Sequence, residues 1–174
     1  MLSVWLQRAD IIDPFWGPGF LVVVGTAAAV NHGIVGLPQW VLMFLVAAWG
    51  LRLGCHLFVR WLHEEHEDRR YAAMREAGSK LWWLRSLLTV FWLQAVILWI
   101  VATPLLFAVV SNSQVVPVAM ICGVVLFCIG LFFEAVGDFQ LTAFKRRADS
   151  SGKVLRTGLW KFTRHPNYFG DFTV

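Results

Sequence analysis

Residues 86–133 read SLLTVFWLQAVILWIVATPLLFAVVSNSQVVPVAMICGVVLFCIGLFF and contain no Asp, Glu, Lys or Arg. A helix that crosses a bilayer needs about 20 predominantly apolar residues, so this tract is long enough for two such helices. Polar and turn-forming residues break the tract near its middle, at SNSQVVP. The tract therefore predicts a hairpin of two transmembrane helices.

A second charge-free tract covers residues 14–51 and is also interrupted by turn-forming residues, at NHGIVGLP. The chain of 174 residues is 58% hydrophobic, which is more than is typical of a soluble globular domain. Its apolar runs are too continuous for membrane barrel strands, which alternate polar and apolar residues over about 10 positions. We therefore predict an all-α, polytopic integral membrane protein, a single membrane domain over residues 1–174, with helices near 15–30, 39–60, 87–110 and 117–144.

Basic residues predict the orientation of the chain, because short loops rich in Lys and Arg remain in the cytoplasm. Seven Lys and Arg face five acidic residues between Arg52 and Arg85, and seven face four from Glu134 onward. The two hairpin loops carry no charge. We expect the chain in the cell inner membrane, with both termini, the connector 61–86 and the segment 145–174 in the cytoplasm. This topology accounts for the net charge of +4, so no nucleic-acid partner is expected.

Two local patterns allow other interpretations. The first apolar run ends in Ala27–Ala29, which resembles the cleavage site of a signal peptide. Asp10 and Asp13 oppose this interpretation, because the leader of a signal peptide is positively charged. In the connector, His63 and His66 lie beside several acids, but no third metal ligand is defined. No metal is therefore predicted.

The last long helix ends in FFEAVGDFQLTAFKRR, which places charged residues on one face. At the helical period, Glu134, Asp138, Leu141 and Lys145 fall within about 40° of one another. Salt bridges between successive turns would explain this stripe, and each would contribute only a few tenths of a kcal/mol if exposed. Because Glu134 begins inside an apolar stretch, a polar ligand at the cytoplasmic rim is the alternative explanation.

The final segment, TGLWKFTRHPNYFGDFTV, predicts an anion site. Pro166 disfavours a helical conformation at His165 and suits the first turn of a helix, so Arg164 and His165 belong to a loop and a new helix begins at Pro166. The start of a helix offers free N–H groups and a partial positive charge. Here it lies close in sequence to Lys161, Arg164 and His165, with Arg156 upstream. Phosphate groups are the ligands most suited to such a site.

Polar residues of the new helix extend this prediction. Asn167, Tyr168 and Asp171 offer the hydrogen-bonding groups that the ribose or amide of a nucleotide needs. The alternative is that Asn167 and Asp171 only cap the helix and complement its dipole.

These motifs carry a family resemblance. GLWKFTRHPNYFGD, with the preceding EAVGDFQLTAFK, resembles the C-terminal signature of the steroid 5-alpha-reductase superfamily, in particular its bacterial branch of integral membrane proteins. IDPFWGPGF, WGLRLGCHLFVRW and EDRRYAAMRE also resemble that branch. The resemblance covers almost the whole chain.

The resemblance implies a membrane reductase that binds NADPH from the cytoplasmic side. Its substrate would be a lipidic or steroid-like enone, reduced at the carbon–carbon double bond. The resemblance nominates a set of cofactor-binding residues on the last long helix, the following loop and the new helix: Glu134, Asp138, Lys145, Arg156, Trp160, Arg164, His165, Asn167, Tyr168 and Asp171. No GxGxxG motif occurs, so this would not be a Rossmann site.

The catalytic residues are not assigned by the resemblance. Tyr168 and Asp171 are the candidates in the final segment. Steroid-reducing members use an acid and a tyrosine to polarise the substrate ketone; Tyr71 and Asp13 are available here, but neither is assigned. Family members also continue beyond this motif, whereas the sequence ends at Val174, so we expect a truncated form with weak or absent turnover.

Two other functions remain open. The related isoprenylcysteine methyltransferases, which use S-adenosylmethionine, share the RHP element followed by an aromatic residue and Gly. They tend to have small or apolar residues in place of Asn167 and Asp171, which favours the reductase. A non-catalytic membrane protein fragment would explain the spans but would leave the clustered polar residues without a task. A lipidic small molecule and membrane lipids are the expected partners; the sequence identifies neither the substrate nor the oligomeric state.

Overall fold

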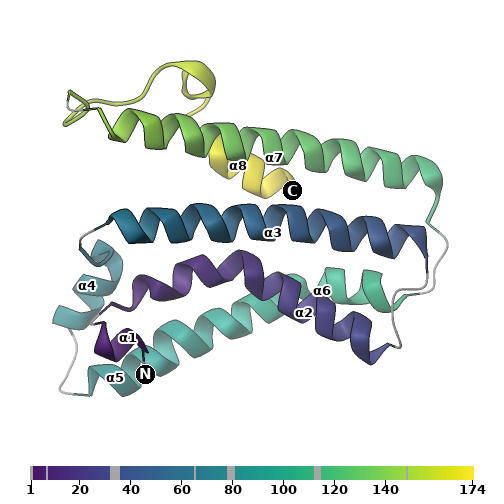
Figure 1. Ribbon diagram of the computed structural model, residues 1–174, viewed down its shortest axis with the longest axis horizontal. Helices are drawn as coiled ribbons and strands as arrows, with labels where there is room; N and C mark the ends of the chain where they lie inside the picture. The colour runs from purple at the N-terminus through teal and green to yellow at the C-terminus, as the bar shows by residue number, and fades with distance from the viewer. Residues whose placement is uncertain are drawn as a thin grey trace. The chain divides into compact units, whose positions relative to one another are not determined.

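The computed structural model describes residues 2–6, 8–31, 36–64, 66–77, 81–111, 115–147 and 149–174. Within these ranges every regular element is helical, which confirms the all-α prediction. In chain order the elements are α1 (Leu2–Trp5), η1 (Asp10–Phe15), α2 (Trp16–Val30), α3 (Leu37–His63), α4 (Arg69–Glu76), α5 (Trp82–Ser86), η2 (Leu87–Trp92), α6 (Leu93–Val110), α7 (Pro117–Lys145), η3 (Gly158–Lys161) and α8 (Pro166–Thr173) (Figure 1).

Among the described residues, four helical segments are long and apolar enough to cross a membrane, as in an integral membrane protein: Asp10–Val30, Leu37–His63, Trp82–Val110 and Pro117–Lys145. They match the four predicted spans. The first begins earlier than predicted, as the 3₁₀ helix η1, and the third begins at Trp82 rather than at residue 87. The prediction began the third span after Arg85, but this side chain is exposed and the helix accommodates it. The centres of the two hairpin loops, 32–35 and 112–114, lie outside the described residues.

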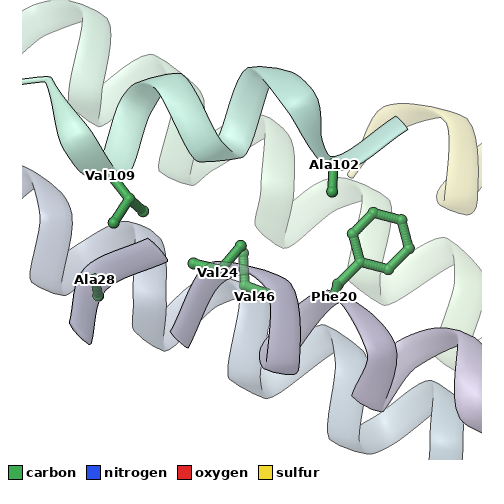
Figure 2. Close-up of a cluster of buried hydrophobic side chains, with 6 residues drawn as sticks. All are labelled: Phe20, Val24, Ala28, Val46, Ala102 and Val109. Atoms are coloured by element: carbon green, nitrogen blue, oxygen red, sulfur yellow. The ribbon is translucent and has the colours of Figure 1, made fainter. Parts of the chain in front are cut away.

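The chain forms two compact units, residues 1–113 and 114–174. The core of the first unit contains small and branched apolar side chains from α2, α3 and α6, which point toward one another in Figure 2. These residues are Phe20, Val24, Ala28, Val46, Ala102 and Val109. The core is narrow because most other apolar side chains of the spans are exposed, as expected of surfaces that face lipid. Membrane lipids are therefore expected contacts of these helices.

Close backbone contact joins α2 to α3. A Cβ atom on Gly17 would overlap the carbonyl group of Gly50, and one on Gly54 would lie 2.7 Å from Cδ of Pro18. Gly50 and Gly54 form a GxxxG pair, a pattern that allows two helices in a membrane to approach closely. The crossing of α2 and α3 therefore depends on the absence of side chains at these positions.

At the other end of this unit, two side-chain amides bind the end of α6. Gln39 Nε2 donates to the carbonyl oxygen of Ser111 at 2.8 Å, and Asn31 Nδ2 donates to that of Val110 at 3.4 Å. These bonds satisfy carbonyl groups that have no partner within the helix. They also fix the ends of α2 and α3 to the end of α6.

In the second unit, α8 lies alongside α7 (Figure 1). A Cβ atom on Gly170 would overlap backbone atoms of Glu134, and one on Gly137 would lie 2.9 Å from the backbone nitrogen of Asn167. The predicted helix start is confirmed: α8 begins at Pro166, and His165 has an extended φ of −141°. The glycines let α8 approach the backbone of α7 directly, which places its first residues against the polar part of that helix.

We predict that Gly17→Ala lowers the stability of the protein while Gly25→Ala does not. Both residues lie on α2, but a Cβ atom on Gly25 would have no neighbour within 4 Å. Overpacking against the backbone of α3 should cost about 1–3 kcal/mol. At Gly25, the change should gain up to about 1 kcal/mol through helix propensity. Thermal unfolding in detergent measures both effects, and equal melting temperatures for the two variants would contradict the prediction.

Candidate functional site

The first unit contains a buried carboxylate with four donors. Asp10 begins η1 and is only 3% exposed. Arg8 donates from Nε to Oδ1 at 3.1 Å and from Nη2 to Oδ2 at 3.0 Å. Trp61 Nε1 donates to Oδ1 at 3.1 Å, and the backbone N–H of Asp68 donates to Oδ2 at 3.0 Å. Asp10 therefore connects the N-terminal segment, the end of α3 and the residue before α4.

A second carboxylate strengthens this junction. The backbone N–H of Ala9 donates to Glu67 Oε1 at 2.6 Å, and Arg75 Nη2 on α4 donates to the same oxygen at 2.9 Å. The guanidinium of Arg8 lies over the ring of Trp61, 4.8 Å from its centroid, at a distance suitable for a cation–π contact. This network joins Ala9, the residue before η1, to Arg75 of α4. It therefore holds α4 against η1.

Holding α4 in this place buries Tyr71, which is 6% exposed. Its hydroxyl donates to Asp13 Oδ1 of η1 at 2.8 Å and accepts from Gln94 Nε2 of α6 at 2.9 Å. Gln94 Oε1 accepts from Trp16 Nε1 of α2 at 3.0 Å. Four elements thus contribute one continuous chain of hydrogen bonds: Trp16, Gln94, Tyr71 and Asp13, called here the Tyr71 chain.

An apolar shell surrounds the Tyr71 chain. Tyr71 packs with the buried side chains of Ala9 and Val90, and partly buried residues close the cluster: Ile12, Met74, Trp82 and Phe91. Burial and, after it, the hydrogen bond to Asp13 together raise the pKa of Tyr71 to about 12. The phenol therefore remains neutral over the physiological range.

Arg70 is the charged neighbour of this pair on α4. It donates to Asp68 Oδ1 at 3.0 Å, and its Nη2 lies 3.5 Å from Asp13 Oδ2. The hydrogen bond from Arg70 lowers the pKa of Asp68, and the contact with Asp68 raises the pKa of Arg70. Both groups are therefore charged at neutral pH. A cavity of about 10 Å³ lies beside Asp13 and has room for about one water. The residues that line it include Asp10, Asp13, Arg60, Trp61 and Asp68.

Sequence reasoning named Tyr71 and Asp13 as available groups but did not pair them, and it missed Trp16, Gln94 and Asp10. The paired residues are separated by 58 positions between Asp13 and Tyr71 and by 78 between Trp16 and Gln94. The available signal was Gln94, a polar amide inside a charge-free span, where a polar side chain is expensive unless it has a partner.

The second unit contains all ten residues that the resemblance nominated for cofactor binding. Asn167 Nδ2 at the start of α8 donates to Asp138 Oδ1 of α7 at 3.0 Å. Trp160 Nε1 of η3 donates to the carbonyl oxygen of Gly137 at 3.1 Å, and the backbone N–H of Leu159 donates to Gln140 Oε1 at 3.0 Å. These bonds fix the loop and the start of α8 against the polar end of α7.

Asn167 has one end of its amide without a partner. Its Oδ1 is buried and accepts no hydrogen bond from the described part of the chain. The residue that caps α8 is His165, whose side chain makes no capping bond. The structure therefore does not support the alternative in which Asn167 caps the helix. A buried acceptor without a donor is costly, so this oxygen needs a donor from a water or from another molecule.

Aromatic rings lie beside Asn167. His165 stacks on Tyr168, with ring centroids 5.0 Å apart and planes at 17°, and the edge of Trp160 meets His165 at 6.3 Å. Tyr168 is 66% exposed, so its ring is open on one side. A flat heterocycle would find a stacking surface here.

The remaining nominated residues lie around this group or apart from it. Arg156 and Arg164 are exposed basic residues of the loop that leads to α8. Glu134 is 3% exposed and lies where α8 packs on α7, so it does not share an open surface with Asp138. Lys145 is exposed at the end of α7, and Asp171 is exposed on α8. The residues of the predicted stripe therefore lie in three different environments. Glu134 is buried, Asp138 accepts a hydrogen bond from Asn167, and Lys145 is exposed.

No group of three or more His, Cys, Asp or Glu side chains is arranged to hold a metal in the described ranges. His63 Nδ1 lies 2.7 Å from the carbonyl oxygen of Val59, within its own helix. Glu65, part of the acidic run between His63 and His66, is outside the described residues.

The chain belongs to the family described as "Protein of unknown function (DUF1295)", which matches residues 1–174. No curated protein and no solved structure matches it.

We predict that Tyr71 ionises near pH 12, about two pH units above an ordinary tyrosine. The chain contains two tyrosines, so Tyr168→Phe leaves Tyr71 as the single titrating phenol. The absorbance of tyrosinate measures its ionisation, and circular dichroism checks that the helices persist.

The same shift has a consequence for stability. Because the folded pKa lies above the unfolded value, neutral Tyr71 stabilises the fold below about pH 10, and this contribution is lost as the pH rises to about 12. Tyr71→Phe should remove this part of the alkaline destabilisation. Ionisation of Tyr71 near pH 10 in the folded protein would contradict the assignment.

Proposed function

We propose that the protein is a membrane-embedded, NADPH-dependent reductase of a carbon–carbon double bond in a lipidic or steroid-like enone. The observation that carries the proposal is the buried, unpartnered oxygen of Asn167 beside an open aromatic stack and exposed basic side chains. The resemblance to the steroid 5-alpha-reductase superfamily supports the same function.

The residues of the second unit fit the chemical parts of NADPH. Arg164 and Arg156 are exposed cations suited to its phosphates, and no side chain caps the first turn of α8. The stack of His165 and Tyr168 offers a surface for a base or for the nicotinamide ring. Asn167 Oδ1 would accept from the carboxamide or from a ribose hydroxyl. When bound, NADPH supplies the hydride that, together with one proton, saturates the double bond of the enone.

The reduction also consumes a proton, and the Asp13–Tyr71 pair of the first unit is a candidate to hold one. A neutral tyrosine that is hydrogen-bonded to an acid is a pair between which a proton is held. The apolar shell around Tyr71 limits the access of water and strengthens such a bond. We propose Asp13 and Tyr71 as candidates for the acid and the tyrosine that the resemblance leaves unassigned. Tyr168 and Asp171, the earlier candidates, are exposed and are assigned to cofactor binding instead.

Cofactor binding should depend on Arg164 and Asn167. We predict that the purified protein binds NADPH with an affinity that falls as salt concentration rises, and that Arg164→Ala weakens binding about 10-fold or more. Asn167→Ala should weaken binding, and because it also removes the hydrogen bond to Asp138, circular dichroism checks that the helices persist. Changes in tryptophan or NADPH fluorescence measure the affinity.

Arg147→Ala is the matched control, because it removes an exposed positive charge of the same unit outside the nominated site. Equal losses for Arg147→Ala and Arg164→Ala would show only a general charge effect. Binding of S-adenosylmethionine, with no response to NADPH, would replace the reductase with the methyltransferase.

A further inference from the structure

The Tyr71 chain has a single possible direction. An indole N–H can only donate, so Trp16 at 3.0 Å makes Gln94 Oε1 an acceptor. The other end of the amide is then its NH₂ group, which also can only donate, and it lies 2.9 Å from the Tyr71 oxygen. Tyr71 therefore accepts from Gln94, and its own proton points to Asp13 at 2.8 Å. Trp16 thus sets the orientation of groups two hydrogen bonds away.

The surroundings maintain this arrangement. Tyr71 is buried among apolar side chains, so water does not readily replace Gln94 as its partner. The charged groups next to the pair come from α4 and the residue before it: Arg70 contacts Asp13 and lies with its guanidinium 5.5 Å from the Tyr71 ring centroid, and Asp68 binds Arg70. Neither group replaces the donor or the acceptor of the Tyr71 hydroxyl.

We propose that Gln94 and Trp16 are positioning residues that fix the direction of the Tyr71 hydroxyl proton toward Asp13. Their consequence for catalysis rests on the proposed reductase function. Without Gln94, the phenol oxygen would lose its donor, and only the bond to Asp13 would hold the direction of the hydroxyl. Without the indole N–H of Trp16, the amide of Gln94 could turn over and present its oxygen to Tyr71, which would compete with Asp13 for the same proton. In either case the hydroxyl proton of Tyr71 would point toward Asp13 for less of the time.

The test measures the hydroxyl of Tyr71 directly, in a Tyr168→Phe background that leaves one tyrosine. The intensity ratio of the tyrosine doublet in the Raman spectrum distinguishes a hydroxyl that donates from one that accepts. In the unmodified chain it should report a hydroxyl that does both. Gln94→Leu should shift the ratio toward that of a donor alone, and Asp13→Ala should shift it the opposite way, toward that of an acceptor. Trp16→Phe should shift it in the same direction as Gln94→Leu but by less.

Gln39→Leu is the matched control, because Gln39 is also a partly buried amide of the first unit but binds the carbonyl group of Ser111 instead. It should leave the ratio unchanged, which separates a direct effect from a general loss of packing. Shifts of the same size in Gln39→Leu and Gln94→Leu would overturn the proposal. A ratio that is unaffected by Trp16→Phe would also overturn it, because the direction would then not depend on the indole.

Activity provides the second measurement. With NADPH and an enone substrate, Gln94→Leu should lower kcat about 10-fold and leave KM nearly unchanged, while Tyr71→Phe should lower kcat by about 100-fold. A loss confined to KM would contradict a positioning role. If the unmodified protein does not bind NADPH, the proposed function fails, and the Raman measurements still decide whether Gln94 and Trp16 direct the proton.

Discussion

The arrangement of the first unit depends on the burial of the Asp10 carboxylate. A buried charge is tolerated only when it is paired and hydrogen-bonded, and Asp10 receives four donors from Arg8, Trp61 and Asp68. Removing one partner would leave a charge without compensation, so these groups must come together for the unit to fold. The contacts of Asp10 with these groups hold α4 next to η1. The position of Tyr71, and with it the chain from Trp16 to Asp13, follows from this constraint.

The Tyr71 chain and the side chain of Asn167 differ in how their polar atoms are satisfied. In the first unit, the hydroxyl of Tyr71 and both ends of the Gln94 amide have partners, which gives the group a defined geometry and direction. In the second unit, Asn167 is held by Asp138 at one end and has a buried oxygen without a partner at the other. A saturated network is suited to controlling a proton, while an unsatisfied acceptor beside basic and aromatic groups is suited to receiving a ligand. This contrast is the physical basis for our proposal that Tyr71 and Asp13 hold a proton and that the residues around Asn167 bind the cofactor.

Prediction from sequence succeeded where one segment contains all the information. The two charge-free tracts indicated four spans, and the structure has them. Pro166 indicated the start of a helix and a non-helical residue before it, and both are present. For the candidate site, the sequence brought attention to Trp160, His165, Asn167, Tyr168 and Asp138, which the structure gathers at one end of α7. It did not show that Glu134 would be covered by α8, since helical periodicity gives the face of a residue but not what packs on it.

The sequence by itself determined the class of the fold, because the length of an apolar run and the restricted backbone around proline are local properties. Only the tertiary structure decided the pairing of Tyr71 with Asp13 and of Gln94 with Trp16. These partners are 58 and 78 residues apart, and they meet because the close crossing of α2 and α3 and the Asp10 junction fix how each helix is rotated and how far it extends. The rotation of a helix about its axis and its position along that axis are set by packing between helices. No single segment of the chain contains that information.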